Sequence, residues 1–303
     1  MIRLTAELID DVCCEISTLM NIEALALCLG TSPELATAEF QMALAEARQT
    51  LSLLENLELP ENGSVLEVGA GMGIASTALS FFGFQVTSLE PGGVGFEINK
   101  STSEHISSTV GTRVSLIVDS AEKVEFKKGT KFDLIISNNV LEHVQNVEKS
   151  LINLLRHLSP SGVMVNSCPN YTFPFEPHFG IPLLPFSPRR TSVFLSSRIR
   201  KSGVWKSLNF VTARQVHRIF SRLDFSVHFR KGTMLKSIVR LNADFQFRGR
   251  HPVLGRIASN PILISLLNRI LSLPYWIATP MDFIVVHKQL AKDERVLEWL
   301  NTQ

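Results

Sequence analysis

The sequence predicts an α/β fold built on a doubly wound, mainly parallel sheet. The stretch VLEVGAGMGIASTALSFFGFQVTSLEP, residues 65–91, reads as a strand, a glycine turn, a helix, a second strand and an acid. That order is the nucleotide-binding half of such a sheet. Further strand and helix patterns alternate downstream, and 45% hydrophobic against 19% charged residues lets the 303-residue chain bury a full core.

The first unit can be assigned element by element. Val65–Val68 is an apolar run with β-branched residues, which predicts a buried strand. Three glycines follow, and glycine permits both a sharp turn and close approach of a ligand to the backbone. Ile74–Phe82 predicts a helix and Phe84–Leu89 the next strand, which places Glu90 at a carboxyl end.

The glycine spacing discriminates between ligands. A dinucleotide fingerprint, GxGxxG, would need its third glycine at Ile74, whereas the chain has GxGxG at Gly69, Gly71 and Gly73. No P-loop lysine follows, which argues against a nucleoside triphosphate. A glycine turn that binds nothing is the alternative.

The remaining pattern supplies the rest of a sheet. It predicts helices at Asn146–Leu158 and Thr212–Arg222, and a Ser-Pro-Ser-Gly turn before the fifth strand. The further strands predicted are Arg113–Val118, Phe132–Ser137, Gly162–Ser167, Phe225–Arg230 and Asp282–His287.

These residues resemble a known family. The acid-x-GxGxG pattern, formed by Glu67 and the three glycines, is similar to the first motif of class I S-adenosylmethionine (SAM) methyltransferases. The segment 131–170, with FDLI and LEHV, resembles the ubiquinone-biosynthesis-like members, and the resemblance spans about residues 62–170. It implies a seven-stranded sheet with an antiparallel last strand, and SAM as cofactor.

The resemblance also implies roles for individual residues. Glu67, Gly69, Gly71 and Gly73 would hold the methionine part of SAM. The ribose would be bound by Glu90, the adenine by Asp119 and Ser120, and Asn138 would lie at the ligand-binding edge.

The chain divides into four parts. Residues 1–58 predict two or three amphipathic helices, broken at Gly30–Pro33, which by analogy with the family form a lid and could equally make a dimer contact. Residues 59–230 are the SAM-binding core, 231–280 a basic and apolar insertion, and 281–303 the last strand and tail.

The candidate catalytic residues follow the fifth strand, in CPNYTFPFEPHFGIPLLPFSPRR. Its six prolines argue against regular secondary structure. We expect His178 to act as a general base that takes a hydroxyl proton, with Glu176 orienting it or binding substrate. His143 in LEHV is the rival, a purely structural histidine is the alternative for each, and methyl transfer by positioning alone would need no base.

No metal is expected from the sequence. Some ubiquinone-pathway O-methyltransferases carry a metal-binding E-x-x-E-H, and here Asn139 stands in place of the first acid. Cys13, Cys14, Cys28 and Cys168 lack metal-ligand spacing and are expected to be thiols packed in helices.

Charge is divided unevenly along the chain. Residues 1–180 hold 10 Lys and Arg against 22 Asp and Glu, whereas residues 181–280 hold 17 against 2. The apolar run at 260–281 is broken by Asn268 and Arg269, so it predicts a helix in a membrane interface, core packing or a dimer seam. A basic insert also suits nucleic acid, but no RNA-binding module is present.

The sequence therefore predicts a SAM-dependent methyltransferase that acts on a hydroxyl of a small-molecule, glycan or lipid-linked acceptor. The segment NYTFPFEPHFGIP resembles loops of bacterial methyltransferases of cell-surface glycan synthesis. We expect a cytoplasmic enzyme without a signal peptide, peripheral on an anionic membrane. The alternatives are an inactive membrane- or partner-binding module and a nucleic-acid methyltransferase. Ser137-Asn138-Asn139-Val140 argues against the latter, since base N-methylation expects an Asn/Asp-Pro-Pro-Tyr tetrapeptide there.

Overall fold

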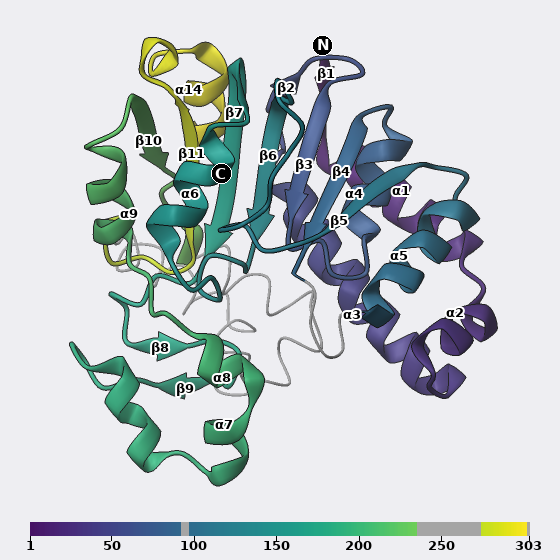
Figure 1. The fold of residues 1–303 in the computed structure, drawn as a ribbon, viewed down its shortest axis with the longest axis horizontal. Helices are drawn as coiled ribbons and strands as arrows, with labels where there is room; N and C mark the ends of the chain where they lie inside the picture. Colours follow the sequence, from purple (N-terminus) through teal and green to yellow (C-terminus); the bar gives the residue numbers. More distant parts are fainter. Residues whose placement is uncertain (92–96, 235–273, 302–303) are drawn as a thin grey trace, which may run out of the picture.

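A seven-stranded sheet forms the centre of the computed structural model, which describes residues 1–91, 97–234 and 274–301. The strand order is β10-β11-β7-β6-β3-β4-β5 (Figure 1). β11 runs antiparallel to β7 and to β10, and the other neighbours pair in parallel. The strands are β3 Ser64–Val68, β4 Gln85–Glu90, β5 Val114–Val118, β6 Phe132–Asn138, β7 Leu158–Cys168, β10 Phe225–Phe229 and β11 Met281–His287. The predicted α/β fold with a mainly parallel seven-stranded sheet is confirmed.

The strand order reverses beside β3. From β3 the chain proceeds outward through β4 and β5, and it then returns to place β6 on the other side of β3. Ligands of open α/β sheets bind outside the carboxyl ends of the strands at such a reversal. The glycine turn after β3 and the polar turn after β6 therefore flank the expected binding crevice.

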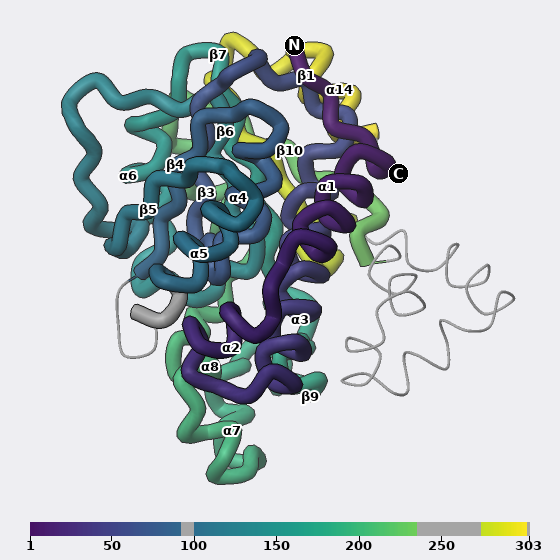
Figure 2. The backbone as a smooth tube through the Cα atoms, turned by 90° about the vertical axis from the view of Figure 1, so that its right-hand side faces the viewer, coloured from purple at the N-terminus to yellow at the C-terminus, as the bar shows by residue number. Residues whose placement is uncertain are grey.

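Helices cover both faces of the sheet (Figure 2). One face packs against the three N-terminal helices, α4 and α14, and the other against α6 and α9. The helices of the core are α1 Ala6–Leu19, α2 Ile22–Leu29, α3 Pro33–Ser52, α4 Ile74–Phe81, α5 Glu97–Thr109, α6 Val147–Leu155, α9 Ala213–Phe220 and α14 Glu294–Asn301.

The predicted break between N-terminal helices is confirmed. Gly30 ends α2 in the left-handed conformation, and the Ser32 side chain caps α3 by accepting a hydrogen bond from the Leu35 N–H. Phe40, on α3, is 1% exposed and belongs to the same apolar cluster as α4 and the sheet. These helices are thus part of the main core, and their action as a lid stays a prediction.

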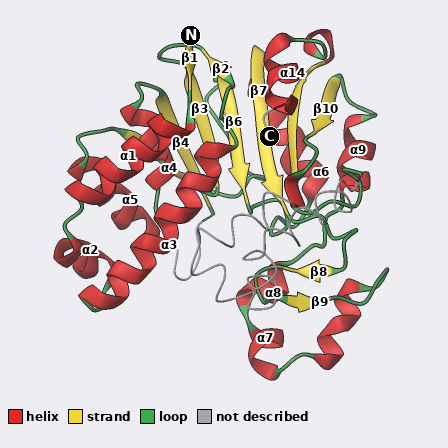
Figure 3. Ribbon diagram, turned by 180° about the vertical axis from the view of Figure 1, so that it is seen from behind, coloured by secondary structure: helices red, strands yellow, loops and turns green. Residues whose placement is uncertain are grey.

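A small lobe follows β7 at the carboxyl edge of the sheet (Figure 3). It has its own apolar cluster around Tyr171, Leu183, Trp205 and Leu208. The expectation that its prolines exclude regular structure is wrong, because Pro182 pairs with Phe175. A two-stranded ribbon has no inner strand, so proline is tolerated at its edge. The elements are β8 Phe175–Glu176, β9 Ile181–Pro182, the 3-10 helix Pro188–Phe194, α7 Ser197–Lys201 and α8 Gly203–Ser207.

The predicted Ser-Pro-Ser-Gly turn is also wrong, because those residues lie within β7. Leu158 already pairs with Phe132, and the register of β6 against β7 shifts between Phe132 and Leu134. The Ser-Pro-Ser-Gly residues form an irregularity in the pairing of β7 with β6 and do not end the strand. Pairing between strands here outweighs the local preference for a turn.

Short elements tie the ends of the chain to the core. β1 Ile2–Arg3 pairs antiparallel with β2 Glu58–Leu59, and the 3-10 helix Lys288–Leu290 follows β11. Cys13 and Cys14 lie on α1 and Cys28 on α2, whereas the expected helical placement is wrong for Cys168, which ends β7 because this residue pairs with Met281 of β11. No single described helix is long and apolar enough to cross a membrane; α1 and α2 reach that length and composition only jointly, across a bend of 82°. Most of the predicted insertion and its apolar run, residues 235–273, lies outside the described residues.

Candidate active site

The glycine turn after β3 is closely packed at Gly69 and has open space beside Gly71. Gly69 has φ +75°, and a Cβ there would lie 2.3 Å from Cγ2 of Val140. Gly71 has φ +53°, and no described atom lies within 4 Å of the position its Cβ would take. Both conformations favour glycine. Gly71 thus leaves space above the turn, whereas Gly69 lets the turn after β6 pack against it.

Glu90 closes the turn from the neighbouring strand. Its Oε2 accepts a hydrogen bond of 2.9 Å from the backbone N–H of Gly71. The side chain is buried, which raises the pKa of its carboxyl, and the Gly71 hydrogen bond opposes that rise. Gly71 and Glu90, which were both predicted to bind SAM, are therefore hydrogen-bonded to each other.

Glu67 lies beneath the turn. Ser76 on α4 donates a hydrogen bond to its carboxylate, and the Ser76 Oγ lies 2.6 Å from the Oγ of Ser88 on β4. Burial raises the pKa of Glu67 to about 7, and the Ser76 hydrogen bond lowers it. This carboxylate fastens α4 to the two strands below it. Its contact with the methionine part of SAM stays a prediction.

Asp119 and Ser120 follow β5 on the outer side of Glu90. The N–H of Asp119 donates to the carbonyl oxygen of Glu90 at 3.0 Å, and the N–H of Ser120 donates to Oδ1 of Asp119 at 2.7 Å. The Oγ of Ser120 is buried and has no hydrogen-bond partner among the described residues. A buried hydroxyl without a partner is a position where a ligand can supply one.

Asn138 ends β6 on the other side of the glycine turn. Its Nδ2 donates to Oγ1 of Thr50 on α3 at 3.2 Å, while its Oδ1 is buried with no described partner. The predicted cofactor residues thus lie along the carboxyl edge of four adjacent strands, with two buried polar atoms left unsatisfied. Their contacts with SAM stay predictions.

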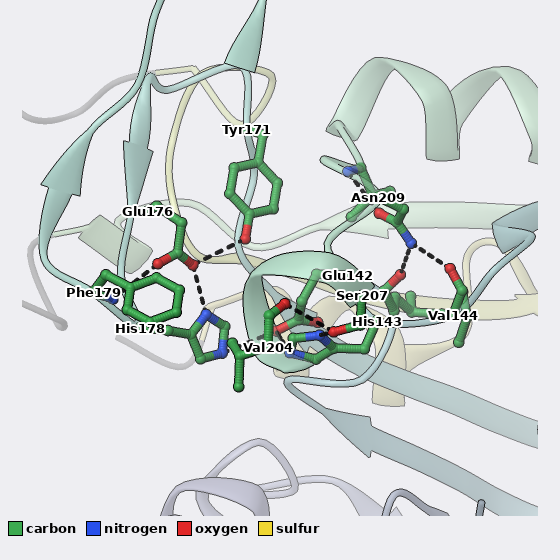
Figure 4. Close-up of polar contacts among 12 residues, drawn as sticks. Glu142, His143, Val144, Tyr171, Glu176, His178, Phe179, Val204, Ser207 and Asn209 are labelled. Carbon is green, nitrogen blue, oxygen red and sulfur yellow. Dashed lines mark hydrogen bonds and ion pairs between the residues drawn. The ribbon is translucent and has the colours of Figure 1, made fainter. Parts of the chain in front are cut away.

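A second polar cluster lies after β6 and β7 (Figure 4). Nε2 of His143 lies 4.0 Å and Nε2 of His178 lies 3.9 Å from Oε1 of Glu142. The sequence offered the two histidines as rivals, but the structure places their rings 5.1 Å apart in one cluster. Val140, which packs on Gly69, belongs to the same turn as Glu142, so the cluster adjoins the glycine turn.

Glu176 anchors His178. Its Oε1 lies 2.6 Å from Nδ1 of His178 and accepts a hydrogen bond from the hydroxyl of Tyr171 at 3.3 Å. Its Oε2 accepts from the N–H of Phe179 at 2.9 Å. Burial and the nearby Glu176 raise the pKa of Tyr171 far above its usual value, so this phenol stays protonated and donates. These contacts hold the Glu176 carboxylate against Nδ1 of His178, as an orienting residue requires. The orienting role itself stays a prediction.

Burial also sets the charge of the cluster. The Glu142 side chain is fully buried, which raises its pKa to about 7, and His178 opposes that rise. Burial and, second, the nearby His178 lower the pKa of His143 to about 4, so its ring is neutral at pH 7.

Asn209 is a positioning residue that the sequence did not reveal. Its Nδ2 donates to the carbonyl oxygens of Leu141 at 2.6 Å and Val144 at 2.8 Å, and its N–H donates to the carbonyl oxygen of Glu142 at 2.8 Å. This clamp fixes the turn that carries Glu142 and His143. Asn209 lies in the segment before α9, and no local motif marks it.

Comparison with known proteins gives the chain's relatives. Residues 39–228 match the profile of a methyltransferase domain family. An uncharacterized protein of Mycobacterium tuberculosis is 31% identical over 229 residues, 72% of this chain and 77% of that protein. The ubiquinone biosynthesis O-methyltransferase of Rickettsia canadensis is 30% identical over 106 residues, 35% of this chain and 42% of that enzyme.

Solved methyltransferase structures align with this chain at low identity. Phosphoethanolamine N-methyltransferase 2 of Haemonchus contortus, bound to SAM, aligns with TM-score 0.49 and 19% identity over 79% of this chain and 52% of its own. This chain therefore spans about half of that enzyme. A putative sarcosine dimethylglycine methyltransferase of Galdieria sulphuraria aligns with TM-score 0.44 and 16% identity over 85% and 87%.

Proposed function

Because this chain belongs to the class I SAM-dependent methyltransferases, we propose that it methylates a hydroxyl of a small-molecule, glycan or lipid-linked acceptor. SAM is the cofactor of the family. In the proposed reaction the acceptor oxygen attacks the sulfonium methyl carbon, the carbon–sulfur bond breaks as the carbon–oxygen bond forms, and S-adenosylhomocysteine leaves. The hydroxyl proton departs into the cluster of Glu142, His143 and His178.

The cluster is the observation that favours a hydroxyl acceptor. A hydroxyl oxygen is a poor nucleophile until its proton is removed, and a positioned base raises the rate by about 10²- to 10⁴-fold. Two imidazoles and two buried carboxylates meet in the turn and loop next to the glycine turn. His178, which Glu176 anchors through Nδ1, is the imidazole that we place as the base.

Metabolite and lipid profiling of cells with and without the protein tests the acceptor. We expect one compound class to gain the mass of one methylene, on oxygen. His178→Gln should lower kcat by about 100-fold and leave SAM affinity unchanged. A product methylated on nitrogen, or full activity of the His178 variant, would contradict the proposal.

The lobe surface supports a lipid-linked acceptor and peripheral contact with an anionic membrane. Phe186 and Phe194 are 105% and 76% exposed. Arg189, Arg198 and Arg200 are exposed on the 3-10 helix and α7 of the same lobe, and residues 181–223 contain no acid. Each basic residue near an anionic surface contributes about 1 kcal/mol, and exposed aromatic rings enter the headgroup region.

Vesicle sedimentation tests this contact. The protein should pellet at low salt with phosphatidylglycerol-containing vesicles and remain in solution with phosphatidylcholine alone. Phe186→Ser with Phe194→Ser should weaken the binding by about tenfold. Equal recovery with both vesicle types would contradict an anionic membrane contact.

A further inference from the structure

The hydrogen bond at Nδ1 of His143 fixes which ring nitrogen faces Glu142. That Nδ1 lies 2.8 Å from the Oγ of Ser207, and the Ser207 hydroxyl donates its own proton to the carbonyl oxygen of Val204 at 2.9 Å. Ser207 must therefore accept from Nδ1–H of His143. The neutral ring then presents the lone pair of Nε2 to Glu142.

His178 is held in the same way. Its Nδ1 lies 2.6 Å from the Glu176 carboxylate, which only accepts when ionised, so Nδ1 carries the proton. Tyr171 and Phe179 fix Glu176 in turn. When the ring is neutral, Nε2 of His178 carries the lone pair, and this nitrogen lies 3.9 Å from Oε1 of Glu142.

Glu142 completes the convergence. Its side chain is fully buried, and neither carboxylate oxygen receives a hydrogen bond from any described residue. One oxygen of Glu142 and one nitrogen of each histidine all lie within 4.8 Å of one another. A buried carboxylate that faces two imidazole nitrogens is unfavourable unless a proton or a metal ion lies between them.

We propose that Glu142, His143 and His178 bind one divalent transition-metal ion. Two imidazole nitrogens and one carboxylate suit Zn²⁺ and similar ions rather than Mg²⁺ or Ca²⁺, which favour oxygen ligands. Two ligand atoms that each lie about 2 Å from a tetrahedral zinc ion are about 3.3 Å apart, so a modest side-chain rotation would bring the present nitrogen–oxygen separations of 3.9 and 4.0 Å to that value. Outer hydrogen bonds from ligand histidines to a carboxylate or hydroxyl are typical of metal sites.

The third ligand explains why sequence spacing gave no metal site. Asn139, in place of the first acid of E-x-x-E-H, is exposed at the start of the turn. His178 instead reaches the cluster from the loop between β8 and β9. Both histidines are about a quarter exposed, which leaves an open coordination position. This deepens and rests on the proposed function: an acceptor oxygen bound there would have its pKa lowered, and its proton would leave to solvent at the exposed side of the cluster instead of to His178, whose Nε2 would be a metal ligand.

Metal titration of chelator-treated full-length protein tests the site. Calorimetry should give one Zn²⁺ per chain, with Mg²⁺ binding far more weakly. Co²⁺ should produce visible d–d absorption that Zn²⁺ displaces. His143→Gln and His178→Gln should each weaken Zn²⁺ binding by about 100-fold and Glu176→Gln by about tenfold. His217→Gln, an exposed histidine on α9, is the matched control and should bind Zn²⁺ as the wild type does.

The outcomes separate this proposal from the proposed function. SAM affinity of the same samples reports that each variant is folded. Absent Co²⁺ absorption, or Zn²⁺ binding that the His143 and His178 variants leave unchanged, overturns the metal site even where methyl transfer is found. Tight stoichiometric Zn²⁺ binding without any hydroxyl methylation supports the metal site and counts against the proposed function.

Discussion

The backbone N–H of Gly71 donates a 2.9 Å hydrogen bond to the carboxylate of Glu90. The turn after β3 and the acid at the end of β4 are therefore one rigid unit, and the carboxylate is held in place before any ligand arrives. An acid fixed in this way loses little freedom when it binds a ribose.

Glu90→Ala should lower SAM affinity by about 100-fold, because two hydrogen bonds from ribose hydroxyls to a charged group would be lost. Calorimetry on folded protein measures this. Glu90→Gln keeps an acceptor for Gly71 and should lose less affinity. Glu15→Ala, at an exposed acid on α1, should have no effect, and an unchanged affinity of the Glu90→Ala variant would refute the ribose assignment.

Gly69→Ala and Gly71→Ala should separate stability from binding. At Gly69 the new methyl would overlap Val140, so we expect a loss of about 3 kcal/mol in the free energy of unfolding. Val140→Ala in the same chain should restore part of it. At Gly71 the methyl enters open space, so stability should fall by only about 1 kcal/mol, while SAM affinity falls by at least about tenfold. Urea unfolding and calorimetry measure the two effects; equal stability losses would contradict this difference.

Asn209→Ala should slow methyl transfer without weakening SAM binding, because it releases the turn that carries Glu142. Asn153 is a matched control, since its Nδ2 donates to the carbonyl oxygens of Ala121 at 3.1 Å and Val124 at 3.0 Å. Each alanine variant should cost about 2 kcal/mol of stability. Asn153→Ala should instead weaken SAM binding, since it loosens the segment after Ser120. If the two variants change the rate of methyl transfer and the SAM affinity by the same amounts, the proposed separation of cofactor and acceptor regions is wrong.

Glu67 should make stability fall as pH rises. Its pKa is raised to about 7 in the folded protein, so the folded state binds the proton more tightly than the unfolded chain, whose pKa is about 4.3. The stabilising contribution is present below the unfolded pKa and is lost as pH rises toward the folded pKa. Glu67→Gln removes this titration. The stability of the variant relative to wild type should rise by about 2.5 kcal/mol from about pH 5 to about pH 8 in urea unfolding without SAM. Parallel pH profiles would disprove the raised pKa.

Much of the fold could be predicted from patterns within short stretches of the sequence. The segment from Ser64 to Glu90 could be predicted because its glycines, apolar runs and terminal acid lie in one contiguous stretch. The turn predicted before Gly162 failed because pairing of Leu158 with Phe132, residues far apart in the sequence, extends β7 through it. Local propensity describes an isolated segment, whereas the sheet is stabilised by non-local pairing.

The polar cluster could be predicted only in part. His143, Glu176 and His178 were identified singly, from residue type and from their place after predicted strands. Their convergence on Glu142 depends on β6 and β7 being neighbours and on the fold of the lobe after β7. The supports Asn209 and Ser207 lie after α7 and act through backbone and hydroxyl groups, which leave no pattern in the sequence.

The position of β11 has a consequence for how the protein is made. This strand pairs with β7 on one side and β10 on the other, so two strands that are translated earlier find their shared partner only after Met281–His287 has been synthesised. During synthesis the growing chain exposes the unpaired edge of β7 until Met281–His287 leaves the ribosome. Nascent chains that stall before that point present an edge that recruits other polypeptides, and chaperone attention or premature degradation should concentrate there.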